Sequence, residues 1–260
     1  MLPRLQLLEF EDQPWWPRSL RDAMTDYLQA LITWFDPYRP AIPLLVAALA
    51  RTGETRVVDL GSGGGGPWAR LEPRLAALGT RLDAVILTDR FPNTAAFAYV
   101  TRGTGGRVIG HTAPVDAARV PPALTGFRTM FTTLHHFPPA QARAIIGDAV
   151  GHRRGIAVFE MTRRSLSAMA GMIVLAALVP LVTPWIRPLR WSRLFWTYLV
   201  PAVPLAFLCD AVVSCLRTYT PDELRALVTP FGNGSYHWEA GCIATPFSAA
   251  PVTFLIGTPI

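Results

Sequence analysis

Residues 56–66 carry the clearest chemical signal in the chain: a short apolar stretch that ends in an acid and is followed by glycines. The β-branched stretch predicts a buried strand, and the glycines predict a tight turn where the backbone can approach a ligand closely. Gly61, Gly63 and Gly66 fit the G-x-G-x-x-G spacing of loops that bind a pyrophosphate at a helix N-terminus. Asp59 argues against pyrophosphate, because its carboxylate would lie beside two phosphate charges. A cationic ligand without phosphate fits the pattern better.

A second acid strengthens the prediction of a nucleoside site. Asp89 ends the next predicted strand, close to the separation of about 20 residues from the loop that is typical of such sites. In a doubly wound sheet, a carboxylate at this position reaches the ribose hydroxyls of a nucleoside bound at the first turn. The structural alternative is that Asp89 caps the helix that follows.

Candidates for acid–base chemistry lie at the ends of two later strands. His135 and His136 follow the fourth predicted strand, on the edge of the sheet that faces the ligand crevice. Either imidazole is a candidate general base for an oxygen or nitrogen nucleophile, or only shapes the pocket. Glu160 ends the fifth strand, where it would orient a substrate amine, stabilise a developing cation, or pair with Arg163 or Arg164.

The elements that must position these residues alternate between strands and helices. Helices are predicted at residues 17–35, 40–50, 68–78, 91–101, 138–150 and 220–230. Strands are predicted at residues 56–60, 82–89, 107–110, 127–134, 155–161, 235–240 and 252–257. This order predicts an α/β fold with a Rossmann-like, doubly wound, mostly parallel seven-stranded sheet, an antiparallel last strand and N-terminal helices.

Composition excludes several classes of protein. Apolar residues make up 51% of the 260 residues and charged residues 16%, which excludes disorder and leaves a large core or a lipid-facing part. The net charge of +6 comes from arginine alone. Six arginines between Thr162 and Arg217 bracket apolar sequence instead of tracing a groove, so we expect no nucleic acid as partner.

The three cysteines are Cys209, Cys215 and Cys242, and they lack the spacing of a zinc site or a disulfide framework. We therefore expect no metal. The N-terminus is acidic and aromatic and has no apolar signal core. A cytoplasmic location follows as the expectation, with membrane association open.

The motif Asp-Leu-Gly-Ser-Gly-Gly-Gly at residues 59–65 resembles the first motif of the class I S-adenosylmethionine-dependent methyltransferases. Leu-His-His-Phe at residues 134–137 resembles the fourth-strand motif of many of their small-molecule members. The likeness runs from about Thr55 to Thr258 and includes the closing pair of strands. It implies S-adenosylmethionine as cofactor and, with the apolar insertion, transfer of its methyl group to a lipophilic small molecule.

The resemblance also implies roles for single residues. Asp59 and the glycine loop would surround the methionine and ribose, Asp89 would bind the ribose, and Asp116 would bind the adenine unless it is only a solvated loop residue. His135, His136 or Glu160 would lie near the acceptor. The full cofactor set is Asp59, Gly61, Ser62, Gly63, Asp89, Arg90, Val115, Asp116, Ala117 and Thr133.

An apolar insertion and an unusual N-terminus depart from a minimal methyltransferase. Residues 166–186 carry no charge, and residues 194–216 carry only Asp210. We expect Asp210, Trp15 and Trp16 to contact the substrate, although Asp210 has the alternative of pairing with Arg217. The expected domains are a helical cap (1–50), the cofactor-binding core (51–161), the insertion (162–217) and the end of the core (218–260).

Three interpretations of the insertion stay open. Both segments are long enough to cross a bilayer as a hairpin. Alternatively, the segment 166–216 lies at the membrane interface, with its arginines beside Trp185, Trp191 and Trp196. In the third interpretation it is a soluble lid whose apolar side chains line the acceptor pocket.

Two other functions remain as alternatives. An NAD-dependent oxidoreductase would use the G-x-G-x-x-G spacing, but the chain has no lysine and therefore no Tyr-x-x-x-Lys pair. A non-catalytic, membrane-associated module would keep the fold as a scaffold. The oligomeric state is not predicted.

Overall fold

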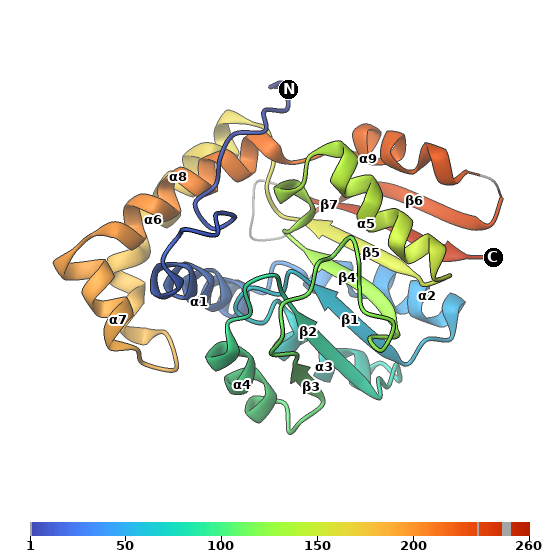
Figure 1. Ribbon diagram of the computed structural model, residues 1–260, viewed down its shortest axis with the longest axis horizontal. Coiled ribbons are helices and arrows are strands. Elements are labelled where there is room, and N and C mark those ends of the chain that lie inside the picture. Colours follow the sequence, from blue (N-terminus) through green and yellow to red (C-terminus); the bar gives the residue numbers. More distant parts are fainter. Residues whose placement is uncertain (1, 233, 246–250) are drawn as a thin grey trace.

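A computed structural model describes residues 2–232, 234–245 and 251–260 and shows a seven-stranded sheet in the order β3-β2-β1-β4-β5-β7-β6 (Figure 1). The strands are β1 (Arg56–Leu60), β2 (Ala84–Thr88), β3 (Val108–Gly110), β4 (Phe127–Phe131), β5 (Ile156–Glu160), β6 (Tyr236–Ile243) and β7 (Val252–Pro259). The first five pair in parallel. β7 is antiparallel to both β5 and β6. The predicted fold class is therefore confirmed.

Helices cover both faces of this sheet. They are α1 (Arg18–Phe35), α2 (Ile42–Thr52), α3 (Trp68–Ala77), α4 (Thr94–Gly103), α5 (Pro139–Gly151), α6 (Leu166–Val182), α7 (Trp191–Leu194), α8 (Ala202–Arg217) and α9 (Pro221–Val228). Successive strand residues point to opposite faces, so Val57 packs with α2, α3 and α4, whereas Val58 packs with α5 and α9. The apolar strands are thus buried on both sides, as a doubly wound sheet requires.

Local capping explains where two helices begin. Thr220 and Glu223 form a capping box at the start of α9, with Pro221 in the first turn, as the sequence predicts. The second case excludes the structural alternative for Asp89. Asn93, not Asp89, caps α4, because its side-chain oxygen accepts from the N–H of Ala96 at 3.2 Å. The Asp89 side chain instead lines the cavity described below.

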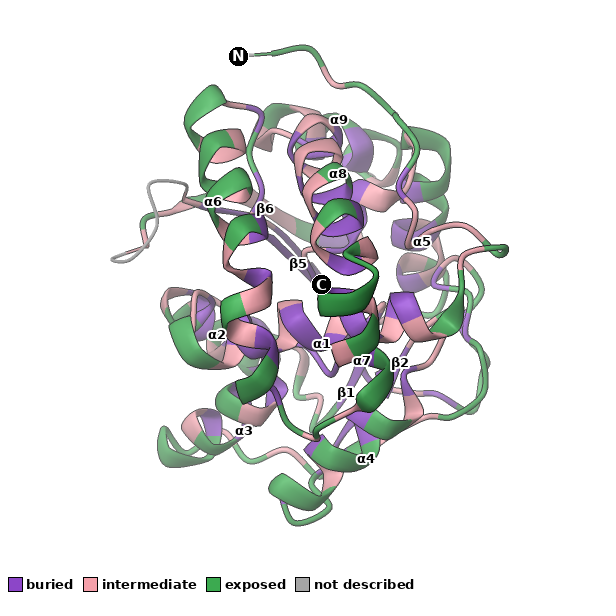
Figure 2. Cartoon of the chain, turned by 90° about the vertical axis from the view of Figure 1, so that its left-hand side faces the viewer, coloured by how far each residue is buried: buried purple, intermediate pink, exposed green. Residues whose placement is uncertain are grey.

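The insertion folds into a helical hairpin beside the sheet. α6 and α8 pack on each other and on α1, where Leu31, Val179 and Val203 belong to one buried cluster (Figure 2). The predicted second segment is not one helix: the stretch Trp191–Leu199, which ends in a π-helical turn, meets α8 at an angle of 83°. Pro201 lies at this bend. Within the described residues, only Leu166–Trp185 is one continuous helix long and apolar enough to cross a membrane.

Candidate functional site

A cavity of about 670 Å³ opens where β1, β2 and β4 end. Its walls are the glycine loop after β1, the turn after β2, the segment after β4, α1, and the N-terminal segment 6–13. β1 and β4 are neighbours in the sheet although β2 and β3 intervene in the chain, so this is the point where the strand order reverses. Ligands of open α/β sheets bind at such a point.

The glycine loop is compressed between two neighbours. Gly61 has φ +68°, and a Cβ there would lie 2.3 Å from the Thr133 side chain, whose hydroxyl donates to the Gly61 carbonyl at 3.0 Å. A Cβ on Gly64 would lie 2.6 Å from the carbonyl oxygen of Thr25 on α1. Gly64 therefore allows α1 to pack directly on the backbone of the loop.

Asp59 supports this loop from beneath and does not line the cavity. Its carboxylate is buried and accepts hydrogen bonds from the hydroxyls of Ser62 and Thr129, each at 2.7 Å. Burial raises the pKa of Asp59 to about 6. The predicted direct contact between Asp59 and a ligand is thus not the arrangement found, because the side chain is turned toward the sheet. Ser62 and Gly63 do lie on the wall.

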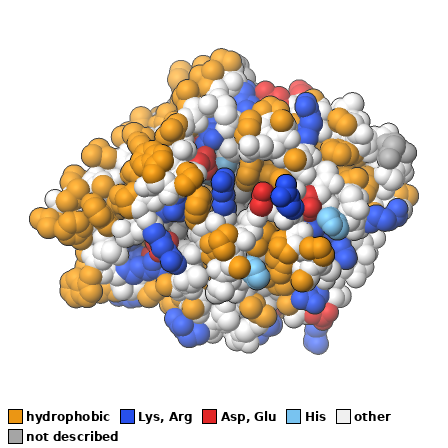
Figure 3. Space-filling model, in the orientation of Figure 1, with side chains coloured by type: hydrophobic (Ala, Val, Ile, Leu, Met, Phe, Trp, Pro, Cys, Tyr) orange, Lys and Arg blue, Asp and Glu red, His pale blue; other side chains and the backbone are white. Residues whose placement is uncertain are grey.

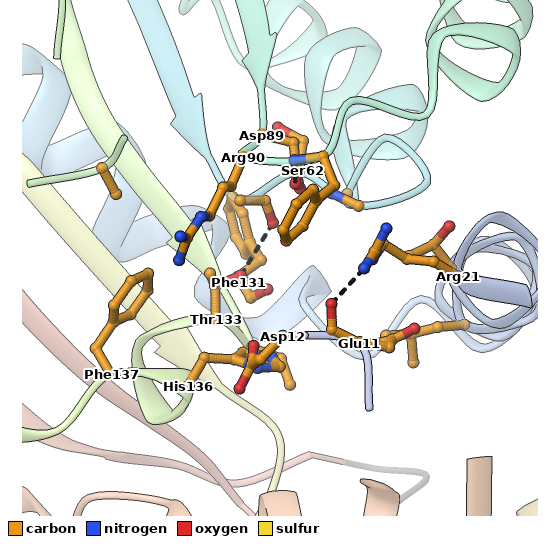
Figure 4. A pocket seen from close by; sticks show the side chains of 18 of the residues that line it. Glu11, Asp12, Arg21, Ser62, Asp89, Arg90, Phe131, Thr133, His136 and Phe137 are labelled. Carbon is orange, nitrogen blue, oxygen red and sulfur yellow. Dashed lines mark hydrogen bonds and ion pairs between the residues drawn. The ribbon is translucent and has the colours of Figure 1, made fainter. Parts of the chain in front are cut away.

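Asp89 faces the cavity from the end of β2 (Figure 4). Its carboxylate accepts from the N–H groups of Gly63 and Phe91, each at 2.8 Å. The Val115 N–H donates to the Asp89 carbonyl at 2.8 Å and so holds the 115–117 turn next to it. Asp116 is exposed on that turn and lines the same wall.

Ten residues were predicted to bind the cofactor, and nine of them surround this one cavity: Gly61, Ser62, Gly63, Asp89, Arg90, Val115, Asp116, Ala117 and Thr133. Strand ends and turns of a parallel sheet meet at one edge, which is why the sequence pattern locates them together.

The predicted catalytic residues separate into two environments. His135 and Glu160 are both buried, with His135 Nδ1 2.7 Å from a Glu160 carboxylate oxygen, and neither lines the cavity. The backbone N–H of His135 donates to the other carboxylate oxygen at 3.2 Å. These two side chains fasten the turn after β4 to β5, so direct contact with a substrate is not supported for them. Only His136 reaches the wall.

His136 belongs to a cluster of four charged residues that we call the clasp: Glu9, Asp12, His136 and Arg217. His136 Nδ1 lies 2.6 Å from Glu9 and 2.8 Å from Asp12, and Arg217 Nη1 lies 2.7 Å from each of the same carboxylates. Burial alone would lower the pKa of His136, but the two carboxylates hold it well above the usual value. A cationic imidazole is a poor general base, so the clasp holds the N-terminal segment in place instead.

Glu11 is the cavity residue that the sequence did not reveal. It lies on the wall opposite the glycine loop (Figure 4). Burial and the neighbouring Asp210 raise its pKa to about 8. Arg21 fixes its backbone by donating to the Glu11 carbonyl at 2.9 Å. The crowding of acids and tryptophans near the N-terminus was a visible signal, but nothing in the pattern distinguished Glu11 from its neighbours.

The three predicted substrate contacts lie off the cavity wall. Asp210 on α8 accepts from the backbone N–H groups of Phe10 and Glu11 at 2.9 and 3.0 Å, so it anchors the N-terminal segment. Trp16 stacks on Phe10 with ring centroids 4.7 Å apart, and Trp15 is largely exposed. The expected alternative, pairing of Asp210 with Arg217, is not found either, since Arg217 serves the clasp.

The soluble-lid interpretation expects apolar side chains of the insertion on the cavity wall, and the structure does not place them there. Among the described residues of the insertion (162–217), only Arg217 lines the cavity. The apolar side of the cavity comes instead from α1 and the ends of β4, through Leu28, Ile32, Phe131 and Phe137. The insertion instead packs against α1, through small and aliphatic residues and through Phe207, whose ring lies edge-on to that of Tyr27.

Comparison with known proteins bears on the fold. No family model matches the chain, and no curated protein matches its sequence. Among solved structures, the chain resembles the plantazolicin methyltransferase BpumL in complex with SAH (S-adenosylhomocysteine), with 8% identity, a TM-score of 0.55 and coverage of 94% of this chain and 95% of that one. It also resembles the pyocyanin biosynthetic protein PhzM, with 15% identity, a TM-score of 0.50 and coverage of 90% and 57%. The chain therefore has the Rossmann-like fold of the class I S-adenosylmethionine-dependent methyltransferases.

Proposed function

We propose that the protein transfers the methyl group of S-adenosylmethionine to a protic oxygen or nitrogen of a lipophilic small molecule. The observation that carries this proposal is the cavity at the strand reversal, with Asp89 and Asp116 on one side and Glu11 on the other. S-adenosylmethionine supplies a methyl group already activated by a sulfonium, so much of the rate would come from positioning.

The wall near the glycine loop suits a nucleoside that carries no phosphate. The Asp89 carboxylate accepts two backbone N–H bonds, which leaves lone pairs for ribose hydroxyls. The N–H of Gly63, which a pyrophosphate would need, is already engaged by Asp89. Asp116 uses one oxygen to accept from Ala118 and keeps the other for an amino group. These contacts favour S-adenosylmethionine over NAD.

The opposite wall suits an acceptor that is apolar but has one protic group. Leu28, Ile32 and Phe131 provide apolar contact. Glu11 would accept the proton that leaves the nucleophile at mildly alkaline pH, where a carboxyl group with a pKa of about 8 is ionised and basic enough for that role. Arg21 and the clasp would keep Glu11 in position.

Isothermal titration calorimetry of the purified protein with S-adenosylmethionine, S-adenosylhomocysteine and NAD tests the cofactor assignment. We expect both sulfur ligands to bind and NAD to give no heat. Asp89→Asn should weaken binding about tenfold or more, since it removes a charged acceptor of hydroxyl hydrogen bonds. Asp222→Asn is the matched control, because Asp222 is 91% exposed and its one ion pair among the described residues is with Arg225 on α9; it should bind like the wild type.

Binding of NAD with no response to either sulfur ligand would contradict the proposal. Absence of binding by all three ligands in a folded protein would favour a non-catalytic module instead.

A further inference from the structure

α6 is apolar on every side but packs through only one. Ala176 and Val179 are buried against its neighbours, whereas Val174 and Leu181 on the opposite stripe are 59% and 69% exposed, and Ile173 on the flank is 53% exposed. Only 17% of the most apolar window within Leu166–Trp185 is buried. A core helix of such composition would be covered on all sides, so the outer stripe of α6 lacks the environment that its residues require.

The exposed apolar surface continues around the hairpin. Trp185 and Trp191 are 70% and 81% exposed, and Leu199 and Leu205 are also exposed. In the space-filling view, hydrophobic side chains gather over this end of the molecule, on the left (Figure 3). We call this surface the hairpin face; its most exposed members are Leu166, Leu181, Trp185, Trp191 and Leu199. A continuous apolar surface of this kind marks an interaction site.

The charges at its border are all positive. Residues 163–209 contain no Asp or Glu. Arg163 and Arg187 are exposed and form no ion pair among the described residues, and Arg187 donates only to the carbonyl of Pro184. A second copy of the same face would bring arginine to arginine with no carboxylate between them. A bilayer with anionic headgroups supplies both the apolar phase and the missing negative charge.

The hairpin turn is tied to the globular part of the protein. Arg193 Nη1 lies 2.5 Å from Asp26 on α1 and both side chains are buried, while Arg190 lies 3.2 Å from Asp22. Passage of the turn across a bilayer would separate these pairs and carry Arg190 and Arg193 through the lipid without their carboxylates, at high energetic cost. The arrangement therefore fits binding at the surface of a membrane and not insertion through it.

We propose that the hairpin face binds the surface of anionic membranes, with α6 along the interface and its tryptophans at headgroup depth. This inference does not depend on the transfer reaction.

Flotation of the full-length protein with vesicles of phosphatidylcholine alone, or with added phosphatidylglycerol, tests it. We expect binding that increases with the anionic lipid. The variant Ile173→Gln/Leu181→Gln/Trp191→Gln should partition at least about tenfold less, because three exposed apolar side chains are removed. Leu78→Gln/Ile109→Gln is the matched control: both residues are exposed and apolar but lie on the sheet domain, away from the hairpin, and this variant should bind like the wild type. Arg187→Glu should reduce binding to the anionic vesicles only.

Three results would overturn the proposal. The first is a monomeric wild-type protein that floats with neither vesicle. The second is a dimer in light scattering that the triple variant dissociates, which would assign the face to a second copy. The third is resistance of the membrane-bound protein to extraction at alkaline pH, which would assign a spanning hairpin.

Discussion

Two adjacent carboxylates, Glu11 and Asp12, show how strongly local surroundings set acid strength in this protein. Burial and Asp210 raise the pKa of Glu11 to about 8. Burial would also raise that of Asp12, but His136 and Arg217 lower the pKa below its usual value. One residue is thus suited to accept a proton and its neighbour to hold a permanent charge.

Glu11→Gln should change how stability depends on pH. A raised pKa means that the folded protein keeps a proton which the unfolded chain has released, so Glu11 lowers stability as pH rises from about 4.5 to about 8. Relative to wild type, we expect Glu11→Gln to gain roughly 3 to 5 kcal/mol of unfolding free energy across this range. Urea denaturation at a series of pH values measures it. A constant difference between the two proteins would show that Glu11 titrates normally.

Single residues were predictable where the position along a strand determines their role. Asp89 and Asp116 follow strand ends and lie on the cavity wall as predicted. The same rule places Glu160 at the correct edge of the sheet, but its side chain turns inward to His135, a choice that depends on packing. Glu11 escaped prediction because Asp210, which raises its pKa, is distant in sequence.

At the scale of elements, the glycine loop and α1 form one unit. Gly64→Ala should lower the unfolding free energy by about 1 to 3 kcal/mol, because its Cβ would lie 2.6 Å from the Thr25 carbonyl and 2.7 Å from the Gln29 Cβ. The matched control is Gly103→Ala at the end of α4, where no atom lies within 4 Å of the added carbon; it should be neutral or slightly stabilising. Thermal unfolding of the two variants provides the measurement. Equal stability of the two variants would mean that α1 shifts to accommodate the added carbon without a loss of unfolding free energy.

The helices and strands themselves were largely predictable from the sequence, but the packing of the insertion against its neighbours was not. The alternation of apolar strands and capped helices predicted the sheet and most of its helices. The packing of the insertion could not be read in the same way, because α6 is apolar on every side and so has no periodicity to indicate which stripe faces α1. The bend at Pro201 also depends on that packing.

At the scale of the whole molecule, the clasp joins the N-terminal segment and the end of α8 to the segment after β4. His136 and Arg217 lower the pKa of Glu9 to about 2, although burial alone would raise it. A lowered pKa means that Glu9 stabilises the fold fully above its unfolded value of about 4.5, and that this stability is lost as pH falls toward 2. We therefore expect the backbone amides of residues 6–13 to lose protection from hydrogen exchange in this acid range.

A variant separates the clasp from general acid unfolding. Arg217→Leu should expose the same amides already at neutral pH, since it leaves the buried Glu9 and the half-buried Asp12 with one cation. Arg225→Leu removes an exposed arginine that pairs with Asp222 and should have no such effect. Protection of residues 6–13 in Arg217→Leu that equals the wild type would show that the hydrogen bonds to Asp210 suffice.

The contacts between the N-terminal segment and α8 also set the order in which the site is completed during synthesis. Phe10 and Asp210 are 200 positions apart, and Asp12 and Arg217 are 205. At the usual rate of translation, roughly 10 to 40 s separate the emergence of the two partners from the ribosome. During that interval the parallel strands and the glycine loop can assemble, while residues 6–13 lack the contacts with Asp210 and Arg217 that hold them in the folded protein. A product that terminates before α8 would therefore have the predicted cofactor half of the cavity and lack the wall that carries Glu11.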